Sequence, residues 1–263
     1  MKIIEDFNRE GMTAVKYPSI GQGQWDLLRE VLDSGKLNVR VFAIWMGGRT
    51  VESARQIRDR LLALPRPPQS LGDARLLSAG VKLYMDGSGG ARTGWMHQDW
   101  NKDYNGTDTG NPGYPTTDPE VFRRQVRLLH NAGIHVSTHA VGDRAIDWVV
   151  DTYAEALKAR PTKGLRHGII HCNCPTDHAL DLMASLQKQY DAALRSYTIW
   201  AARQLFLENR IGSIEKGKDA DLAVWDRDPY QLPTADLKNL KCELTMVAGR
   251  IVYQSAEAAA IFR

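Results

Sequence analysis

The sequence predicts an α/β protein built on a parallel sheet, and three observations support this class. Through about residue 190, short β-rich runs alternate with segments of helical periodicity, which is typical of βα units. The pattern then changes to a long helical segment at 192–209, followed by antiparallel β segments at 211–226 and 242–253. The length of 263 residues and the hydrophobic fraction of 43% are sufficient for one large core or two smaller cores.

Five strand and helix units can be placed in order along the first part of the chain. Thr50, Asp118 and Thr176 stand where helix N-caps are expected, since their side-chain oxygens can accept free backbone N–H groups. A long loop at 86–117 separates the third strand from its helix. The expected strands lie at 12–17, 39–44, 81–85, 134–139 and 165–171. The expected helices lie at 25–32, 51–64, 119–129, 145–157 and 177–187.

Composition excludes several classes of protein. The formal net charge is +3, with basic and acidic residues interleaved, so no nucleic-acid partner is expected. No run approaches the roughly 18 apolar residues of a membrane span, and residues 1–6 do not resemble a signal peptide. Cys172, Cys174 and Cys242 form an odd, sparse set, which favours free thiols in a reducing compartment. A cytoplasmic location is therefore the default expectation.

Two expected strands each deliver a histidine to their C-terminal end, where parallel α/β folds bind ligands. Residues four apart on a strand lie about 13 Å apart, so His135 cannot share a metal with His139, nor His167 with His171. Adjacent strands lie about 4.8 Å apart, so His139 and His171 could reach one ion. From spacing alone, hydrogen-bonded core histidines are the favoured interpretation. Lys82 lies inside an apolar strand, where it needs a partner, chemical alteration or a path to the sheet edge.

Four segments carry a family resemblance. They are VKLYMDGSGGARTGWM at 81–96, HAVGDRAIDWVVDTYAEA at 139–156, RHGIIHC at 166–172 and IGSIEKGKDADLAVWDRDP at 211–229. Together and in this order, they resemble the amidohydrolase superfamily, in the branch of metal-dependent hydrolases related to N-substituted formamide deformylase. The resemblance covers most of the chain.

The resemblance implies an incomplete (β/α)8 TIM-type barrel with the C-terminal part of a small β-sandwich domain. The barrel portion would occupy 1–210, the sandwich portion 211–254 and a tail 255–263. It also implies a divalent metal, with zinc the expected ion, and a small amide-type substrate whose C–N bond is hydrolysed by activated water.

The resemblance also assigns residues. His139 matches the family's metal histidine on the fifth strand and His171 the one on the sixth. Lys82 matches a fourth-strand position that can be carboxylated to bridge two metals. Arg92 is a candidate substrate contact, with a loop-ordering role equally open.

The departures from the family pattern leave the activity open. No His-x-His motif and no final-strand aspartate occur, and a deletion is expected near 191–192, so no catalytic residue is assigned. The leading interpretation is a shortened hydrolase. Whether the isolated chain is active stays open. The alternatives are a non-catalytic subunit completed by a partner, including a homo-oligomer through exposed strand edges, and a binding module using the loop at 95–114.

Overall fold

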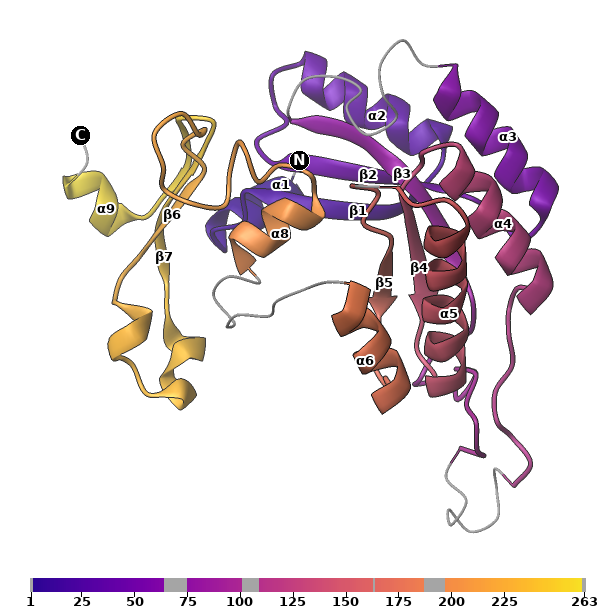
Figure 1. Ribbon diagram of the computed structural model, residues 1–263. Coiled ribbons are helices and arrows are strands. Elements are labelled where there is room, and N and C mark those ends of the chain that lie inside the picture. The colour runs from indigo at the N-terminus through magenta and orange to yellow at the C-terminus, as the bar shows by residue number, and fades with distance from the viewer. Residues whose placement is uncertain (1, 64–74, 101–108, 163, 187–196, 262–263) are drawn as a thin grey trace.

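The computed structural model describes residues 2–63, 75–100, 109–162, 164–186 and 197–261, and it confirms the α/β class. Five parallel strands pair in sequence order and curl into part of a barrel (Figure 1). Among the described residues, the first and last strands form the two edges of this sheet. The strands are β1 (Ala14–Ile20), β2 (Arg40–Met46), β3 (Leu76–Tyr84), β4 (Val136–Ala140) and β5 (Gly168–His171).

Helices follow the strands and cover the convex face of the sheet (Figure 1). The three expected caps are confirmed: Thr50 accepts the backbone N–H of Ser53, Asp118 those of Glu120 and Val121, and Thr176 that of Ala179. Each cap satisfies donors that the first helical turn leaves free. These helices are α2 (Gln22–Asp33), α3 (Val51–Leu62), α4 (Pro119–Asn131), α5 (Asp143–Ala159) and α6 (Asp177–Leu186).

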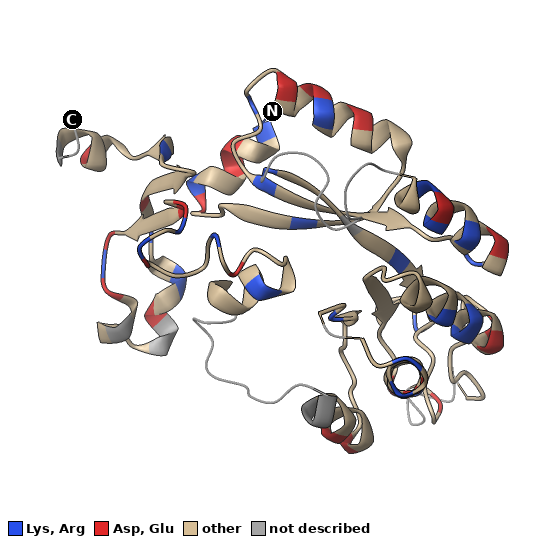
Figure 2. Ribbon diagram, turned by 45° about the horizontal axis from the view of Figure 1, so that its top comes forward, with Lys and Arg blue, Asp and Glu red and all other residues tan. Residues whose placement is uncertain are grey.

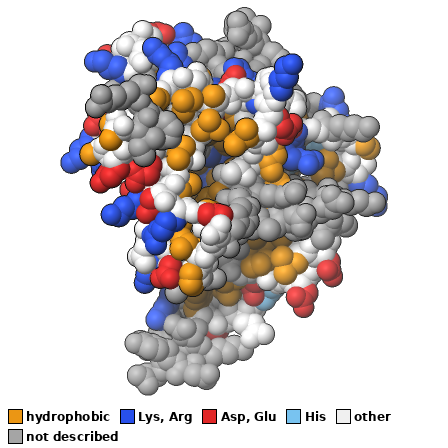
Figure 3. Space-filling view, turned by 90° about the vertical axis from the view of Figure 1, so that its left-hand side faces the viewer, with side chains coloured by type: hydrophobic (Ala, Val, Ile, Leu, Met, Phe, Trp, Pro, Cys, Tyr) orange, Lys and Arg blue, Asp and Glu red, His pale blue; other side chains and the backbone are white. Residues whose placement is uncertain are grey.

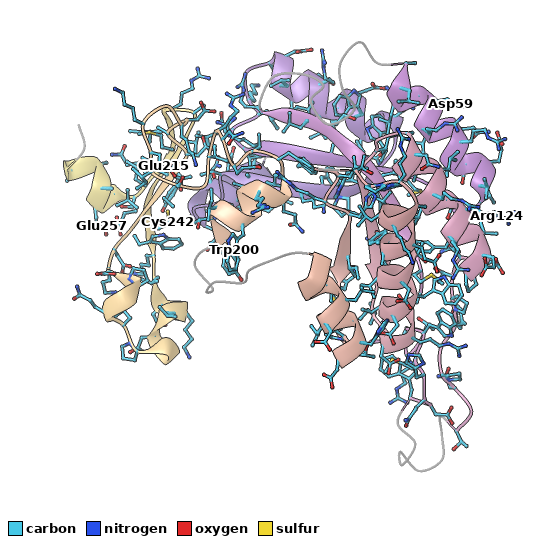
Figure 4. The ribbon with its side chains drawn as sticks, viewed as in Figure 1. Asp59, Arg124, Trp200, Glu215, Cys242 and Glu257 are labelled. Carbon is cyan, nitrogen blue, oxygen red and sulfur yellow. The ribbon has the colours of Figure 1, made fainter. Side chains whose placement is uncertain are left out.

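The main core lies between the sheet and these helices. Its apolar side chains come from alternate strand positions and from one face of each helix, and each buried side chain contributes roughly 1.5–3 kcal/mol. Charged residues of both signs remain on the outer helix faces (Figure 2). Asp59 of α3 and Arg124 of α4 lie on this outer side, away from the concave face (Figure 4). Fully buried members of this core include Leu37, Val81, Leu83, Phe122, Val126, Ile134, Val136, Ile146 and Val149.

A second, antiparallel sheet confirms the expected small β portion. It consists of β6 (Leu222–Trp225), β7 (Cys242–Val247) and β8 (Arg250–Gln254), and α9 (Ala256–Ile261) follows it. Ala248 and Gly249 join β7 to β8 with φ values of 49° and 78°, as a two-residue hairpin turn requires. Two short 3-10 helices, η1 (Pro229–Gln231) and η2 (Thr234–Asn239), lie between β6 and β7.

Helix α1 (Lys2–Arg9) is an element for which the sequence analysis gave no expectation. It packs on the small sheet, so the N-terminal segment and the C-terminal strands form one unit. The Thr245 hydroxyl donates to the Asn8 carbonyl at 2.6 Å, and the Asn8 amide donates to the Asn38 carbonyl at 2.9 Å. Asn8 therefore ties α1 to both the small sheet and the main sheet.

The small sheet leaves apolar side chains at the surface. Figure 3 shows apolar side chains among charged ones on the face of the molecule that carries this sheet. The exposed large apolar residues of its strands are Val224, Trp225 and Ile251. A sheet covered on both faces would bury such side chains.

The prediction of a long helix at 192–209 is wrong for the part of this segment that the structure describes. Helix α8 (Ile199–Gln204) ends well before residue 209, and Phe206 adopts a left-handed φ of 60° that turns the chain. The reason is packing, because Leu205 and Leu207 fill the concave side of the sheet against Phe42. Trp200 of α8 projects away from the sheet (Figure 4). The deletion expected near 191–192 lies outside the described residues.

A buried ion pair fixes the junction between the two sheets. Arg40 of β2 donates to both oxygens of Asp221, at 2.7 and 2.9 Å, and to Asp219 at 2.8 Å. The side chains of Arg40 and Asp221 are each 2% exposed. Within the described ranges, no helix has the length and apolar character required to cross a membrane.

Candidate metal centre

Strands β4 and β5 bring His139 and His171 together at the C-terminal edge of the sheet. In the register of the two strands, Ala140 pairs with His171, which places the two histidines one position apart. Their ring centroids lie 4.6 Å apart with an interplanar angle of 73°. The His139 side chain is 15% exposed, so solvent reaches the pair. The geometry therefore agrees with the convergence expected from strand spacing.

Hydrogen bonding fixes the orientation of His139. Its Nε2 lies 2.6 Å from the Gly87 carbonyl oxygen and 3.6 Å from Asp86 Oδ1. Because a carbonyl only accepts, Nε2 carries a proton, so in the neutral form of the ring Nδ1 has the lone pair. A neutral imidazole held in this way is suited to bind a metal through Nδ1.

Asp86 is a positioning residue to which the sequence analysis assigned no role. Its carboxylate is fully buried and accepts backbone N–H groups of Trp95 at 2.9 Å, Gly142 at 2.8 Å and Val141 at 3.0 Å. These donors come from the loop after β3 and from the turn between β4 and α5. A Cβ on Gly142 would lie 2.1 Å from the Trp95 carbonyl oxygen, so only glycine allows this close approach. Asp86 therefore holds the loop and the end of β4 beside His139.

His171 ends β5 in an unusual backbone conformation. His171 and Cys172 have left-handed φ values of 79° and 53°, which are uncommon for residues with a side chain. Burial lowers the pKa of His171 below its usual range, and the nearby His139 and Lys82 lower it further. A neutral imidazole is the form that binds a metal, so this electrostatic setting favours a ligand role.

Lys82 lies on the same concave face of the sheet, where it pairs with Ser137 in the register of β3 and β4. Its Nζ lies 4.9 Å from the ring centroid of Tyr84, and the residue is 2% exposed. Burial lowers the pKa of Lys82 to about 8, with a further contribution from Lys16. Among the described residues, no group of three or more His, Cys, Asp or Glu side chains could hold a metal. The ligand role of Lys82 therefore stays a prediction.

His135 and His167 are hydrogen-bonded core histidines, in agreement with their exclusion from the candidate pair. His135 Nδ1 lies 2.9 Å from the Leu165 carbonyl oxygen, and its Nε2 lies 2.8 Å from Ser137 Oγ. His167 Nε2 lies 2.9 Å from His130 Nδ1. Burial lowers the pKa of both His135 and His167 to about 3, so both rings are neutral at physiological pH.

Arg92 takes part in the long loop through its backbone. It adopts a left-handed φ of 53°, its N–H donates to the Gly89 carbonyl at 3.0 Å, and its carbonyl accepts from Asn111 at 3.3 Å. These bonds support the loop-ordering role. Substrate contact by the Arg92 side chain stays a prediction, and residues 101–108 of the loop at 95–114 lie outside the described ranges.

This chain matches a protein-family model over most of its length. The model described as the amidohydrolase family matches residues 2–194 and 188–253. The chain belongs to the amidohydrolase family.

Two curated relatives illustrate the similarity. The N-substituted formamide deformylase of Arthrobacter pascens is 44% identical over 64 residues, which is 24% of this chain and 12% of the relative. Protein LONG AFTER FAR-RED 3 of Arabidopsis thaliana is 30% identical over 114 residues, 43% of this chain and 18% of the relative.

Solved structures agree with the amidohydrolase fold. An uncharacterized metal-dependent hydrolase from Pyrococcus furiosus superimposes with a TM-score of 0.54 and 20% identity, over 82% of this chain and 57% of that protein. At this identity the likeness concerns the fold. The chain spans less than half the length of the curated relatives that it matches.

Proposed function

We propose that this amidohydrolase-family chain contributes His139 and His171 to a divalent metal centre that hydrolyses a non-peptide C–N bond of a small amide. The observation that carries the proposal is the convergence of the two rings, 4.6 Å apart, at the end of the sheet where such folds bind ligands. Similarity to N-substituted formamide deformylase supports an N-formyl or N-acyl amine as the substrate class. Zinc suits imidazole ligands and is the expected ion.

The described residues fit part of such a centre. His139 offers Nδ1 because the Gly87 carbonyl occupies Nε2, and His171 offers a ring whose pKa is lowered. When bound, the ion supplies Lewis acidity, which polarises a carbonyl and makes water more acidic. A catalytic zinc usually has three protein ligands, so at least one ligand must come from beyond this pair.

Asp86 and the loop after β3 orient the centre. The buried carboxylate holds three N–H groups, and the Gly87 carbonyl that follows it fixes the ring of His139. The backbone of this loop therefore sets which nitrogen faces the substrate side. Among the described residues, the His171 ring forms no hydrogen bond, which leaves its nitrogens available to a metal.

Hydrolysis of N-formyl and N-acyl amines by the zinc-loaded chain tests this proposal. We expect turnover to fall by at least about a hundredfold in His139→Ala and in His171→Ala, because each removes half of the ligand pair. The matched control is His178→Ala, an exposed histidine bound to Asp151, which should keep the wild-type rate. Absence of turnover by the wild-type chain at every concentration would exclude hydrolysis by this chain alone.

The sheet order favours a second candidate function, a subunit completed by a partner. Among the described strands, β1 and β5 are edges, and edge strands present free N–H and C=O groups for pairing. A second copy could supply strands and ligands in this arrangement. Turnover per chain that increases with chain concentration in the same assay would favour the completed assembly, whereas a constant turnover per chain would favour a self-sufficient centre.

A further inference from the structure

Two buried histidines, His130 and His167, form a hydrogen-bonded relay at the opposite end of β5 from His171. His167 precedes β5, and its Nδ1 accepts the backbone N–H of Val136, the first residue of β4, at 3.1 Å. Its Nε2 lies 2.9 Å from Nδ1 of His130, in the last turn of α4. His130 Nε2 lies 2.8 Å from the carbonyl oxygen of Arg160, which follows α5. The His130–His167 relay therefore connects β4, the start of β5, α4 and the end of α5.

The bonds of the relay allow one arrangement of protons when both rings are neutral. Val136 donates through its backbone N–H, so Nδ1 of His167 is an acceptor and Nε2 carries the proton. His167 Nε2 then donates to Nδ1 of His130, and His130 Nε2 donates to the Arg160 carbonyl. The Thr162 hydroxyl, which donates to the same carbonyl, lies 2.9 Å from His130 Nε2. All protons of the relay therefore point in one direction.

An added proton has no acceptor in this relay. On His167 it would occupy Nδ1 and point at the N–H of Val136. On His130 it would occupy Nδ1 and point at the N–H of His167. A move of the His167 proton to Nδ1 would again place it against Val136. Either ring can therefore become a cation only if a hydrogen bond of the relay breaks, because two N–H donors cannot satisfy each other.

The groups that face His167 do not offset a positive charge on it. The ring centroid of His135, which precedes β4, lies 6.4 Å away, and that of Tyr153 of α5 lies 5.1 Å away. Burial raises the pKa of Tyr153, so its hydroxyl is uncharged. The Arg160 guanidinium, at the far end of the relay, binds a backbone carbonyl of α4. The pKa of His167 is lowered from 6.5 to about 3, by burial first and then by the nearby His135 and His130.

The relay holds the strand that carries His171. Strand β5 has four residues, and among the described strands it pairs only with β4. Further anchors are the Tyr153 hydroxyl, 3.2 Å from the Gly168 carbonyl oxygen, and the ion pair of Arg166 with Glu208, which is partly exposed. Short elements with few contacts open at a lower free energy than the core. Loss of the relay should therefore release β5 and His171 while the other strands stay paired.

We propose that the His130–His167 relay is a pH-sensitive latch for strand β5. In neutral solution the uncharged relay keeps β5 in the sheet and His171 beside His139. In mildly acidic solution the open state is favoured, because His167 can take up a proton there without facing another donor. The latch does not rest on the proposed hydrolase function, and it makes the assembly of the histidine pair depend on pH.

The closed state loses stability as the pH falls from 6.5 toward about 3. The pKa of His167 is lowered in the closed state, so the latch is most stable above the ordinary value of 6.5. Below about pH 6, uptake of one proton by His167 should raise the opening equilibrium by about tenfold per pH unit. His135 adds to this slope where its bond to the Leu165 carbonyl opens with β5, because its pKa is also lowered to about 3.

Hydrogen exchange of the full chain, followed by NMR from about pH 7 to about pH 4, tests the latch. The protection of each amide is expressed relative to its intrinsic exchange rate at that pH. The reporter is the Cys172 amide at the end of β5, which donates to the Ala140 carbonyl at 3.0 Å. The reference is the Arg40 amide of β2, which donates to the Thr13 carbonyl at 2.8 Å. We expect Cys172 to be less protected than Arg40 at each pH, and its protection to fall by about tenfold or more per pH unit below about pH 6.

The variant His167→Asn assigns the proton to His167. The asparagine oxygen can accept the N–H of Val136 in place of Nδ1, and the side chain does not titrate. The pH dependence of Cys172 protection should therefore be smaller by about tenfold per pH unit. A general loss of stability in this variant does not obscure the result, because the slope is compared and not the level. His97→Asn removes a histidine that is 48% exposed, and it should keep the wild-type slope.

Long-range proton–nitrogen NMR spectra of the wild-type chain give an independent readout. His130 and His167 should both carry their proton on Nε2 at neutral pH, and His167 should stay neutral until β5 opens. Three results would overturn the latch. They are a charged or Nδ1-protonated His167 ring at neutral pH, equal protection of the Cys172 and Arg40 amides at every pH, and equal slopes in the wild-type and His167→Asn chains.

Discussion

Replacement of Arg40 by methionine should lower the free energy of unfolding by about 3–5 kcal/mol. Arg40 and Asp221 are each 2% exposed and joined at 2.7 Å, so the variant leaves a buried carboxylate without its cation. Asp221 also accepts the backbone N–H of Ala248 at 2.8 Å, which keeps it in place. Urea denaturation at neutral pH measures the change.

Arg210→Met is the matched control for that variant. Arg210 also contacts Asp219 at 2.8 Å, but its side chain is 51% exposed, and exposed pairs contribute about 0–1 kcal/mol. Equal losses in the Arg40 and Arg210 variants would show that the junction of the two sheets does not depend on the buried pair.

Asp86→Ala should destabilise the chain by about 3–5 kcal/mol, because it removes an acceptor that three backbone N–H groups share. The loss should be local first, at the loop after β3 and at the turn that leads from β4 to α5. Hydrogen exchange of the amides of Trp95, Val141 and Gly142 measures that local opening, and urea denaturation measures the total.

The Asp118→Ala variant provides the comparison for Asp86. Asp118 is an exposed helix cap that accepts two N–H groups, and loss of such a cap typically costs about 1 kcal/mol. If Asp86→Ala cost no more than Asp118→Ala, the buried carboxylate would not be the anchor described above.

The histidine pair could be predicted from sequence because its geometry is local to two strands. Position at the C-terminal ends of β4 and β5 favours His139 and His171 over His135 and His167, and the structure brings the first two rings together while the other two are hydrogen-bonded elsewhere. Strand direction and the edge of a parallel sheet were sufficient for this inference.

Asp86 could not be assigned a role in the same way. Its partners Val141 and Gly142 lie 55 and 56 residues further along the chain, and the contact forms only when β3 and β4 pair. The available sequence signals are the Asp86-Gly87 pair, which follows β3, and the glycine at 142, and neither signal identifies the partner of Asp86.

The error at 192–209 has a different cause. Helical periodicity there predicts a single helix, but Leu205 and Leu207 pack with Phe42 on the concave face, so the chain turns at Phe206. Tertiary packing overrides local propensity in such cases.

Zinc binding by the metal-free chain tests the central claim most directly, that His139 and His171 are two ligands of one metal. Titration followed by X-ray absorption at the zinc edge should show bound zinc with imidazole nitrogens at about 2.0–2.1 Å. Affinity should fall by at least about a hundredfold in His139→Ala and in His171→Ala, and should be unchanged in His178→Ala. Equal affinity in all of these proteins, or no imidazole coordination in the wild-type chain, would contradict the account.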